Sequence, residues 1–196
     1  MADTTLDTDE PFLRPIDDPS DPEIKQAFQN MQQYFGKVMT PARVFNSRMP
    51  PEFLQFYTQI SALDQKLELP KETAMLIRQQ VARMNVCLFC IDSNRAATIW
   101  ASMNQEKFDA LDQYQTSPLF SEAERVALDY VTVLTKERKV NPKIFAKLLN
   151  HYSERQICEI VYLVASEHIY NMTNIGLNIH SDMLCNIAQK RGEGKW

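Results

Sequence analysis

Helix-start sequences recur along this chain, and they constrain its fold more than any other feature. Ser20, Ser121 and Ser153 are each followed three positions later by Glu or Gln. This is the spacing of a capping box, in which the serine and the later side chain satisfy the first free backbone N–H groups of a helix. Apolar residues then recur at intervals of three and four, as on one buried helix face. A helix is therefore predicted after each of these serines.

The rest of the chain fits the same helical interpretation. Glycine is scarce, with 4 residues in 196, and no alternation of strand and helix patterns is visible. Further helices are expected over 42–48, 52–67, 106–113 and after Pro70 and Pro142. We expect one all-α domain over residues 20–190, a helical bundle, preceded by an extended proline-bearing arm over residues 1–19.

Charge and hydropathy exclude several classes of function. The net charge is −4 and the pI is about 5.4, which argues against a nucleic-acid partner. No apolar run approaches the roughly 20 residues that span a bilayer, and the first ten residues lack the apolar core of a signal peptide. Four cysteines without a framework pattern suit a reducing compartment. We expect a cytoplasmic protein that neither binds nucleic acid nor inserts into a membrane.

Cys87 and Cys90 form a CxxC pair, which in a reducing compartment is more often catalytic or metal-binding than structural. Positions three apart lie on one helix face, so the two thiols can form a local disulfide. Asn85-Val86 marks a possible break just before the pair. If the helix restarts there, its N-terminus lowers a cysteine pKa; if residues 71–103 form one unbroken helix, that help is absent.

Three blocks of sequence, in order, resemble the alkylhydroperoxidase-D-like, carboxymuconolactone-decarboxylase superfamily. They are residues 77–94 around the cysteine pair, residues 117–128, and Tyr170-Asn171 followed by residues 175–185. The resemblance covers about residues 50 to 185. It implies an all-helical subunit that assembles as a homo-oligomer, a trimer or hexamer, and a thiol-dependent peroxidase with an antioxidant role. Its partners would be a small-molecule peroxide and an external dithiol or protein reductant, and it implies no cofactor.

Carried over by position, the resemblance makes Cys90 the peroxidatic thiol and Cys87 the resolving one. The family places a glutamate twelve residues before the first cysteine and a histidine four after the second. Here those positions hold Met75 and Asn94. Neither side chain transfers protons near neutral pH, and losing general acid–base help costs about 10²–10⁴-fold in rate.

A relocated proton relay has three further candidates besides the Asn94 position, namely Glu72, Glu167 and His168. His168 falls on an apolar stripe, where a hydrogen-bonded core histidine is the simpler interpretation. Glu167 is expected to face solvent or a partner subunit, and Cys158 to be a small buried apolar residue.

Two other functions stay open at this point. One is a degenerate family member without peroxidase activity, either a binding module or a carboxymuconolactone-decarboxylase-like enzyme. The other is a zinc site formed by Cys87, Cys90, His180 and Cys185, although their spacing matches no standard zinc motif.

Overall fold

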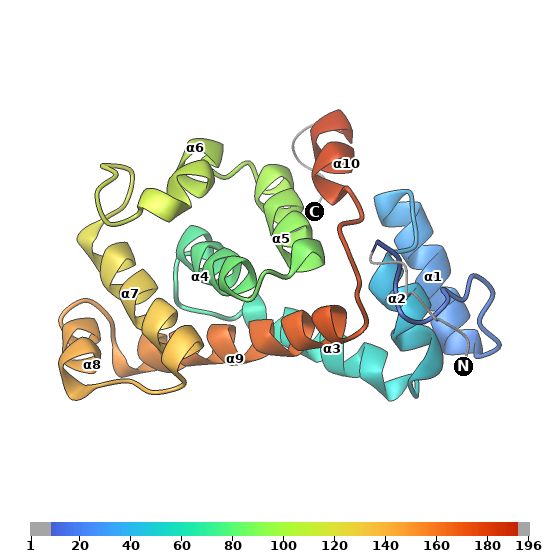
Figure 1. Ribbon diagram of the computed structural model, residues 1–196, viewed down its shortest axis with the longest axis horizontal. Coiled ribbons are helices and arrows are strands. Elements are labelled where there is room, and N and C mark those ends of the chain that lie inside the picture. The colour runs from blue at the N-terminus through green and yellow to red at the C-terminus, as the bar shows by residue number, and fades with distance from the viewer. Residues whose placement is uncertain (1–8, 192–196) are drawn as a thin grey trace, which may run out of the picture.

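The computed structural model describes residues 9–191, and this part of the chain is helical with no strand (Figure 1). The all-α prediction is confirmed. The α-helices are α1 (Pro22–Phe35), α2 (Thr40–Val44), α3 (Glu52–Asp64), α4 (Lys71–Met84), α5 (Leu88–Trp100), α6 (Gln105–Asp109), α7 (Glu122–Glu137), α8 (Pro142–Leu149), α9 (Glu154–Gly176) and α10 (Leu184–Arg191). Two short 3₁₀ helices, η1 (Asn46–Arg48) and η2 (Ala110–Gln113), lie between them.

Two of the three predicted capping boxes are present. Ser121 at the start of α7 and Ser153 at the start of α9 each accept the backbone N–H three residues on, and that residue's side chain accepts the serine N–H in return. The prediction for Ser20 is wrong. The α1 cap is Asp21, whose carboxylate accepts the N–H groups of Glu23 and Ile24. A carboxylate placed one residue later reaches the same orphan donors and adds negative charge at the positive helix end.

Helix α4 is the centre of the bundle, packed against α5, α7 and α9 (Figure 1). Its buried face, with Ile77 and Val81, joins an apolar cluster contributed by α7, α8 and α9. A second cluster surrounds the cysteine pair between α5 and α10. The long helix α9 runs beside both halves of the molecule, so residues far apart along it face different neighbours (Figure 1).

The chain breaks between α4 and α5, where Asn85-Val86 predicted a possible interruption. Asn85 ends α4, and Val86 takes a left-handed backbone conformation with φ of 56°. The Cys87 N–H then returns to the carbonyl oxygen of Ala82 at 3.0 Å, which closes the end of α4. A branched residue such as valine rarely adopts this conformation. The break starts a new helix at Leu88, directly at the cysteine pair.

Helix α10, which the sequence analysis did not separate from the rest of the domain, is fixed to α5 by Asp92. The Asp92 carboxylate accepts the backbone N–H groups of Leu184 at 2.7 Å and Cys185 at 3.0 Å. A side chain of the cysteine helix therefore caps the N-terminus of α10 from outside.

The N-terminal arm was predicted to be extended over residues 1–19, of which residues 1–8 lie outside the described residues. The described part of the arm forms backbone hydrogen bonds with other segments of the same chain. The Phe12 N–H bonds the carbonyl oxygen of Leu177 at 3.1 Å, and the Ile16 N–H bonds that of Arg43 at 2.9 Å.

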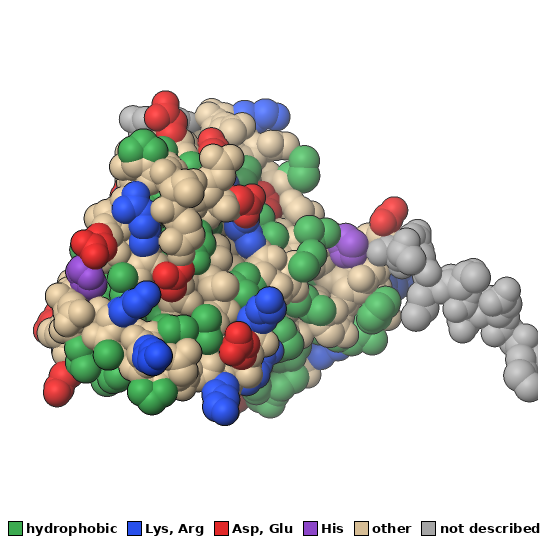
Figure 2. Space-filling view, turned by 60° about the vertical axis from the view of Figure 1, so that its left-hand side comes forward, with side chains coloured by type: hydrophobic (Ala, Val, Ile, Leu, Met, Phe, Trp, Pro, Cys, Tyr) green, Lys and Arg blue, Asp and Glu red, His purple; other side chains and the backbone are tan. Residues whose placement is uncertain are grey.

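The surface mixes charges of both signs. On the face turned forward in Figure 2, Lys and Arg side chains lie among Asp and Glu side chains and do not gather into a basic patch. Within the described residues, no helix is both long enough and apolar enough to cross a lipid bilayer.

Candidate functional site

Cys87 and Cys90 are joined by a disulfide at the N-terminus of α5, with their Cα atoms 5.2 Å apart. Cys87 is the N-cap residue, and its sulfur accepts the backbone N–H of Cys90 at 3.4 Å. Both residues are buried, with exposed fractions of 1% and 2%. The helix therefore restarts where its free N–H groups and positive dipole end favour a thiolate.

A cavity of about 670 Å³ lies against one side of the pair. It is bounded by side chains of α1, α3, α4, α5 and α9, with further residues from α2 and the segment that follows it. Its apolar walls are Met31, Phe35, Met39, Phe45, Leu54, Tyr57, Met75, Phe89 and Tyr170. Cys90 lines this cavity, whereas Cys87 does not. The volume and the aromatic lining are typical of a pocket for a small apolar molecule.

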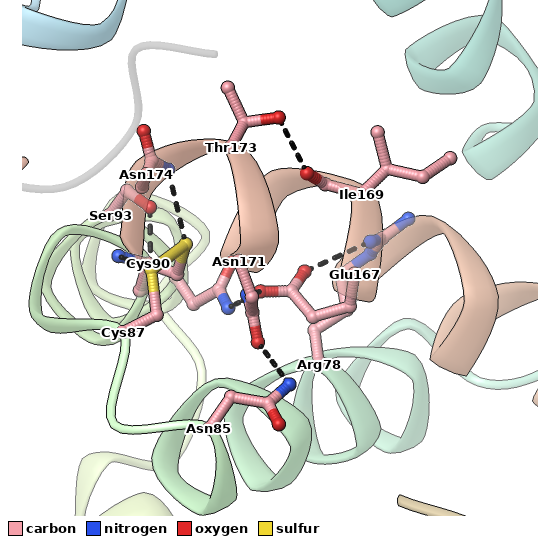
Figure 3. Close-up of a disulfide and its surroundings, with 11 residues drawn as sticks. Arg78, Asn85, Cys87, Cys90, Ser93, Glu167, Ile169, Asn171, Thr173 and Asn174 are labelled. Atoms are coloured by element: carbon pink, nitrogen blue, oxygen red, sulfur yellow. Dashed lines mark hydrogen bonds and ion pairs between the residues drawn. A yellow bond between two sulfur atoms is a disulfide. The ribbon is translucent and has the colours of Figure 1, made fainter. Parts of the chain in front are cut away.

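Glu167 is buried at the polar end of the cavity, with an exposed fraction of 2%. The expectation that it faces solvent or a partner subunit is wrong, because α9 turns this position toward α4 and α5 (Figure 3). Its carboxylate pairs with the guanidinium of Arg78 at 3.1 Å and accepts the side-chain amide of Asn94 at 3.1 Å. Burial raises the pKa of the Glu167 carboxyl, although Arg78 and the amides of Asn94 and Asn171 oppose the shift.

Arg78 lies between two carboxylates. Besides Glu167, it binds both carboxylate oxygens of Asp64, at 2.9 and 2.8 Å. Burial disfavours its charge, but Glu167 and Asp64 outweigh that effect and raise the Arg78 pKa. One cation facing two acids leaves one negative charge in excess. This balance favours a proton on the more deeply buried carboxyl, Glu167.

Three residues on one face of α9 connect this cluster to the sulfur atoms (Figure 3). Asn171 donates from its side-chain amide to Glu167 at 2.9 Å and accepts the amide of Asn85 at 2.8 Å. Asn174 donates to the sulfur of Cys90 at 3.3 Å. Sequence reasoning missed Asn174 as a site residue. The signal was its helical spacing from Glu167 and Asn171, which places the three on one face.

The remaining relay candidates lie elsewhere. The Glu72 carboxylate pairs with the ammonium group of Lys107 at 2.7 Å, beside Glu124, and is not part of the cavity lining. The Nδ1–H of His168 donates to the Val164 carbonyl oxygen of its own helix at 2.9 Å, as in a core histidine. The structure brings Asn94 and Glu167 together near Cys90, but it brings neither Glu72 nor His168 there.

The residues of the alternative zinc site do not converge. Within residues 9–191, no three His, Cys, Asp or Glu side chains form a group that could hold a metal ion. The Cys185 thiol donates to the Asp92 carbonyl oxygen at 3.3 Å, and burial raises the pKa of this thiol to about 12. The buried position expected for Cys158 is wrong, because its side chain is exposed on α9.

Solved structures with the same fold cover most of this chain. An alkylhydroperoxidase AhpD core protein from Ralstonia eutropha JMP134, described as an uncharacterized peroxidase-related protein, superposes with a TM-score of 0.75 at 20% identity. That similarity covers 90% of this chain and 95% of the other. The debrominase Bmp8, in complex with 2,3,4-tribromopyrrole, superposes with a TM-score of 0.76 at 18% identity, covering 91% of this chain and 96% of its own.

By sequence, the chain is 25% identical over 162 residues to the uncharacterized protein YnjA of Escherichia coli (strain K12). The match covers 82% of this chain and 88% of that protein. Residues 63–169 also match the family model described as DNA polymerase III, delta subunit, and by this sequence criterion that stretch, more than half of the chain, belongs to the family. The stretch contains α4 to α8 and most of α9, including the cysteine pair. The superposed structures cover 91% and 90% of this chain, a larger share than that stretch.

The fold comparison and the three sequence blocks agree with each other. The superposed structures include a peroxidase-related AhpD core protein, which covers 90% of this chain. The chain therefore has the AhpD-like fold.

Proposed function

We propose that this chain is a thiol–disulfide oxidoreductase of the peroxidase type, in which Cys90 attacks the substrate and Cys87 resolves the product. The observation that carries the proposal is the position of Cys90, which lines the aromatic cavity while Cys87 lies behind it at the helix N-cap. The substrate class that fits is a small apolar peroxide. The two thiols supply both electrons, so the reaction needs no cofactor.

The reaction has two steps that end in the observed disulfide. The Cys90 thiolate attacks one peroxide oxygen and the O–O bond breaks. Cys90 becomes a sulfenic acid, and the other oxygen leaves as an alkoxide that takes up a proton. The Cys87 thiolate then attacks the Cys90 sulfur and expels the hydroxyl group, which leaves as water after protonation. An external dithiol restores both thiols by two exchange reactions.

Glu167 supplies the proton in this proposal. Asn94 occupies the position of the family's histidine and has no proton to transfer, but its amide bonds the Glu167 carboxylate. A buried carboxyl of raised pKa keeps a proton closer to neutral pH than an exposed one. The proton relay is thus transferred to α9. The Asn94 side chain orients the carboxyl, and neither Glu72 nor His168 takes part.

Reductive dehalogenation is a second candidate, favoured by the similarity to Bmp8 over 91% of this chain and by the aromatic cavity walls. In this reaction a carbon–halogen bond of an aromatic ring is replaced by a carbon–hydrogen bond. The halogen leaves as halide, the ring carbon takes up a proton, and the thiol pair provides two electrons and ends as the same disulfide. The two candidates therefore share the residues Cys90 and Cys87 and differ in the substrate.

The experiment uses the reduced full chain with dithiothreitol and either cumene hydroperoxide or 2,3,4-tribromopyrrole. We expect the natural chain to consume one of these two compounds, and the Cys90→Ser variant to consume neither. With cumene hydroperoxide and without dithiothreitol, we expect Cys87→Ser to react once and to leave a sulfenic acid on Cys90, trapped by dimedone and read by mass spectrometry. The matched control is Cys158→Ser, which removes an exposed thiol on α9 and should react as the natural chain does.

Two results would contradict the proposal. One is a natural chain that consumes neither compound faster than dithiothreitol alone, which would support the degenerate family member. The other is a Cys90→Ser variant that keeps its activity.

The proposal extends to assembly, partners and compartment. Helix α9 exposes a row of large apolar side chains, Val161, Ile169, Met172 and Ile175. In this proposal the row packs against a second copy of the chain, in a homo-oligomer of three or six subunits. The reductant is an external dithiol or protein reductant, and a reducing cytoplasm is the compartment in which the pair is regenerated.

A further inference from the structure

Asn174 is the side chain of α9 that reaches the reactive cysteine. It lies in the last turn of the helix, is 4% exposed and lines the cavity beside Cys90. Its amide nitrogen donates to the Cys90 sulfur at 3.3 Å (Figure 3). The sulfur in a disulfide is a weak acceptor, so this contact gains little in the oxidised protein.

The other end of the same amide lacks a partner. The side-chain oxygen of Asn174 is buried and accepts no hydrogen bond in the part of the chain that the structure describes. Buried acceptors without a donor are rare in folded proteins, and each calls for an explanation. In the oxidised protein, Asn174 therefore has a weak acceptor at its nitrogen and no donor at its oxygen.

Reduction of the disulfide can remove either deficit, and the protonation state of Cys90 decides which one. A Cys90 thiolate carries a negative charge and accepts the amide N–H far more strongly than a disulfide sulfur does. A protonated Cys90 has an S–H group that can donate to the amide oxygen after the amide turns over. Asn174 thus has a suitable group for either protonation state of reduced Cys90, and its best acceptor is the thiolate.

The two cysteine sulfur atoms accept hydrogen bonds from different donors. Cys87 accepts a backbone N–H at the helix N-cap, whereas Cys90 accepts the side-chain amide of Asn174 from another helix. Asn94 has another partner, because its amide nitrogen donates to Glu167.

We propose that Asn174 is a positioning residue that holds and stabilises the Cys90 thiolate, and so favours the dithiol form of the pair over the disulfide. The inference rests on the proposed function, since it assigns the donor for the attacking sulfur. It adds a residue that the family's cysteine–histidine–glutamate pattern does not contain.

The first test measures the pH dependence of Cys90 alkylation by iodoacetamide in Cys87→Ser, where no disulfide forms and serine retains a helix cap. Adding Asn174→Ala should slow alkylation about tenfold at pH values below the Cys90 pKa, as expected for a rise of one unit in that pKa. Asn174→Asp keeps the shape of the side chain but places an anion beside the sulfur, and should slow alkylation further. Asn186→Asp on α10 is the control, because its exposed side chain adds the same charge away from the pair.

A second measurement uses the otherwise natural chain and does not depend on any substrate. The chain is equilibrated with mixtures of reduced and oxidised glutathione, and the fraction of the Cys87–Cys90 disulfide is read by mass spectrometry. At a pH above the Cys90 pKa, Asn174→Ala should raise the ratio of the squared concentration of reduced glutathione to the concentration of oxidised glutathione at the midpoint about tenfold, because the thiolate loses its donor. Thermal melts of each variant confirm that it is folded, and Asn174→Ser replaces any variant that is not.

The outcomes separate the two proposals. If Cys90 in Cys87→Ser titrates near the free-cysteine value of about 8.5, the proposed function loses its activated nucleophile. If its pKa is well below that value and the Asn174 variants change neither alkylation nor the glutathione midpoint, the role of Asn174 alone is overturned.

Discussion

Two glutamates lie buried on the same helix, α9, eight positions apart, and they have opposite electrostatic character. Glu159 accepts the backbone N–H groups of Glu68 and Leu69 at 2.9 and 3.0 Å, and Arg155 at 2.7 Å. Glu167 accepts only side chains, those of Arg78, Asn94 and Asn171. Burial alone would raise both pKa values. Backbone donors and Arg155 outweigh it at Glu159 and lower that pKa, whereas burial prevails at Glu167.

The difference shows how one helix serves both structure and chemistry. At Glu159 the carboxylate holds the segment entering α4, because the charged form accepts the two backbone donors and Arg155 more strongly than a neutral carboxyl does. At Glu167 the partners are side chains around a cavity, and the carboxyl retains a proton more readily. The end of α9 near Glu159 stabilises the bundle, and the end near Glu167 holds the site.

The largest effect should follow from Glu167→Gln, which keeps the shape of the side chain but removes its proton transfer. We expect turnover of the substrate to fall about 10²-fold or more, as for a lost general acid. The measurement is the steady-state rate with dithiothreitol. Glu159→Gln is the matched control on the same helix and should leave the rate unchanged. An unchanged rate in Glu167→Gln would remove this residue from the relay.

A smaller effect, on stability, should follow from Glu159→Ala. The variant leaves the buried N–H of Leu69 and the N–H of Glu68 without their acceptor, and we expect a loss of about 2 kcal/mol in the free energy of unfolding. Urea titration followed by circular dichroism measures it. If Glu159→Ala unfolds at the same urea concentration as the natural chain, the structural role of Glu159 is contradicted.

The smallest effect, and the most direct test of the contrast, is in the pH dependence of stability. At Glu159 the folded-state pKa is lowered from 4.5, so its contribution is present above the unfolded pKa and is lost as pH falls through the folded pKa. At Glu167 the folded-state pKa is raised from 4.5, so its protonated form stabilises the fold at low pH. That contribution is lost as pH rises through the folded pKa.

The test measures the free energy of unfolding between pH 3 and 7 for the natural chain, Glu159→Gln and Glu167→Gln. Subtracting the value of each variant from that of the natural chain gives two differences. The difference between the natural chain and Glu159→Gln should rise with pH, and the one for Glu167→Gln should fall. If both differences changed with pH in the same direction, the two carboxyl groups would have the same electrostatic character.

Much of the fold follows from local sequence. The capping boxes at Ser121 and Ser153, the helix start after Pro70 and the break at Asn85-Val86 were all predictable, because each depends on residues within a few positions. The prediction of a Ser20 cap was wrong although it also used only neighbouring residues, because the adjacent Asp21 is an equally good cap. The CxxC pair was visible in the same way, whereas its place at a helix start was one of two alternatives that the structure decided.

The candidate site was predictable only in part. The sequence indicated the two cysteines and named Glu167 among the possible relays, but placed its side chain at the surface. Cys158 was placed in the core and is exposed. Both errors have one cause. Helix α9 is covered on several sides by different neighbours, so a single apolar stripe does not define which of its faces are buried.

The sequence by itself determined the helical class, most helix starts and the presence of a CxxC pair beside a possible helix break. Only the tertiary structure decided that Cys90 faces a cavity, that Glu167 meets Arg78 and that Asn174 reaches the sulfur. Asn174 and Cys90 are 84 positions apart in the sequence, and Arg78 and Glu167 are 89 positions apart. Caps and breaks are set by backbone groups nearby in sequence, whereas the protonation of a buried group is set by whichever side chains the packing of distant helices brings against it.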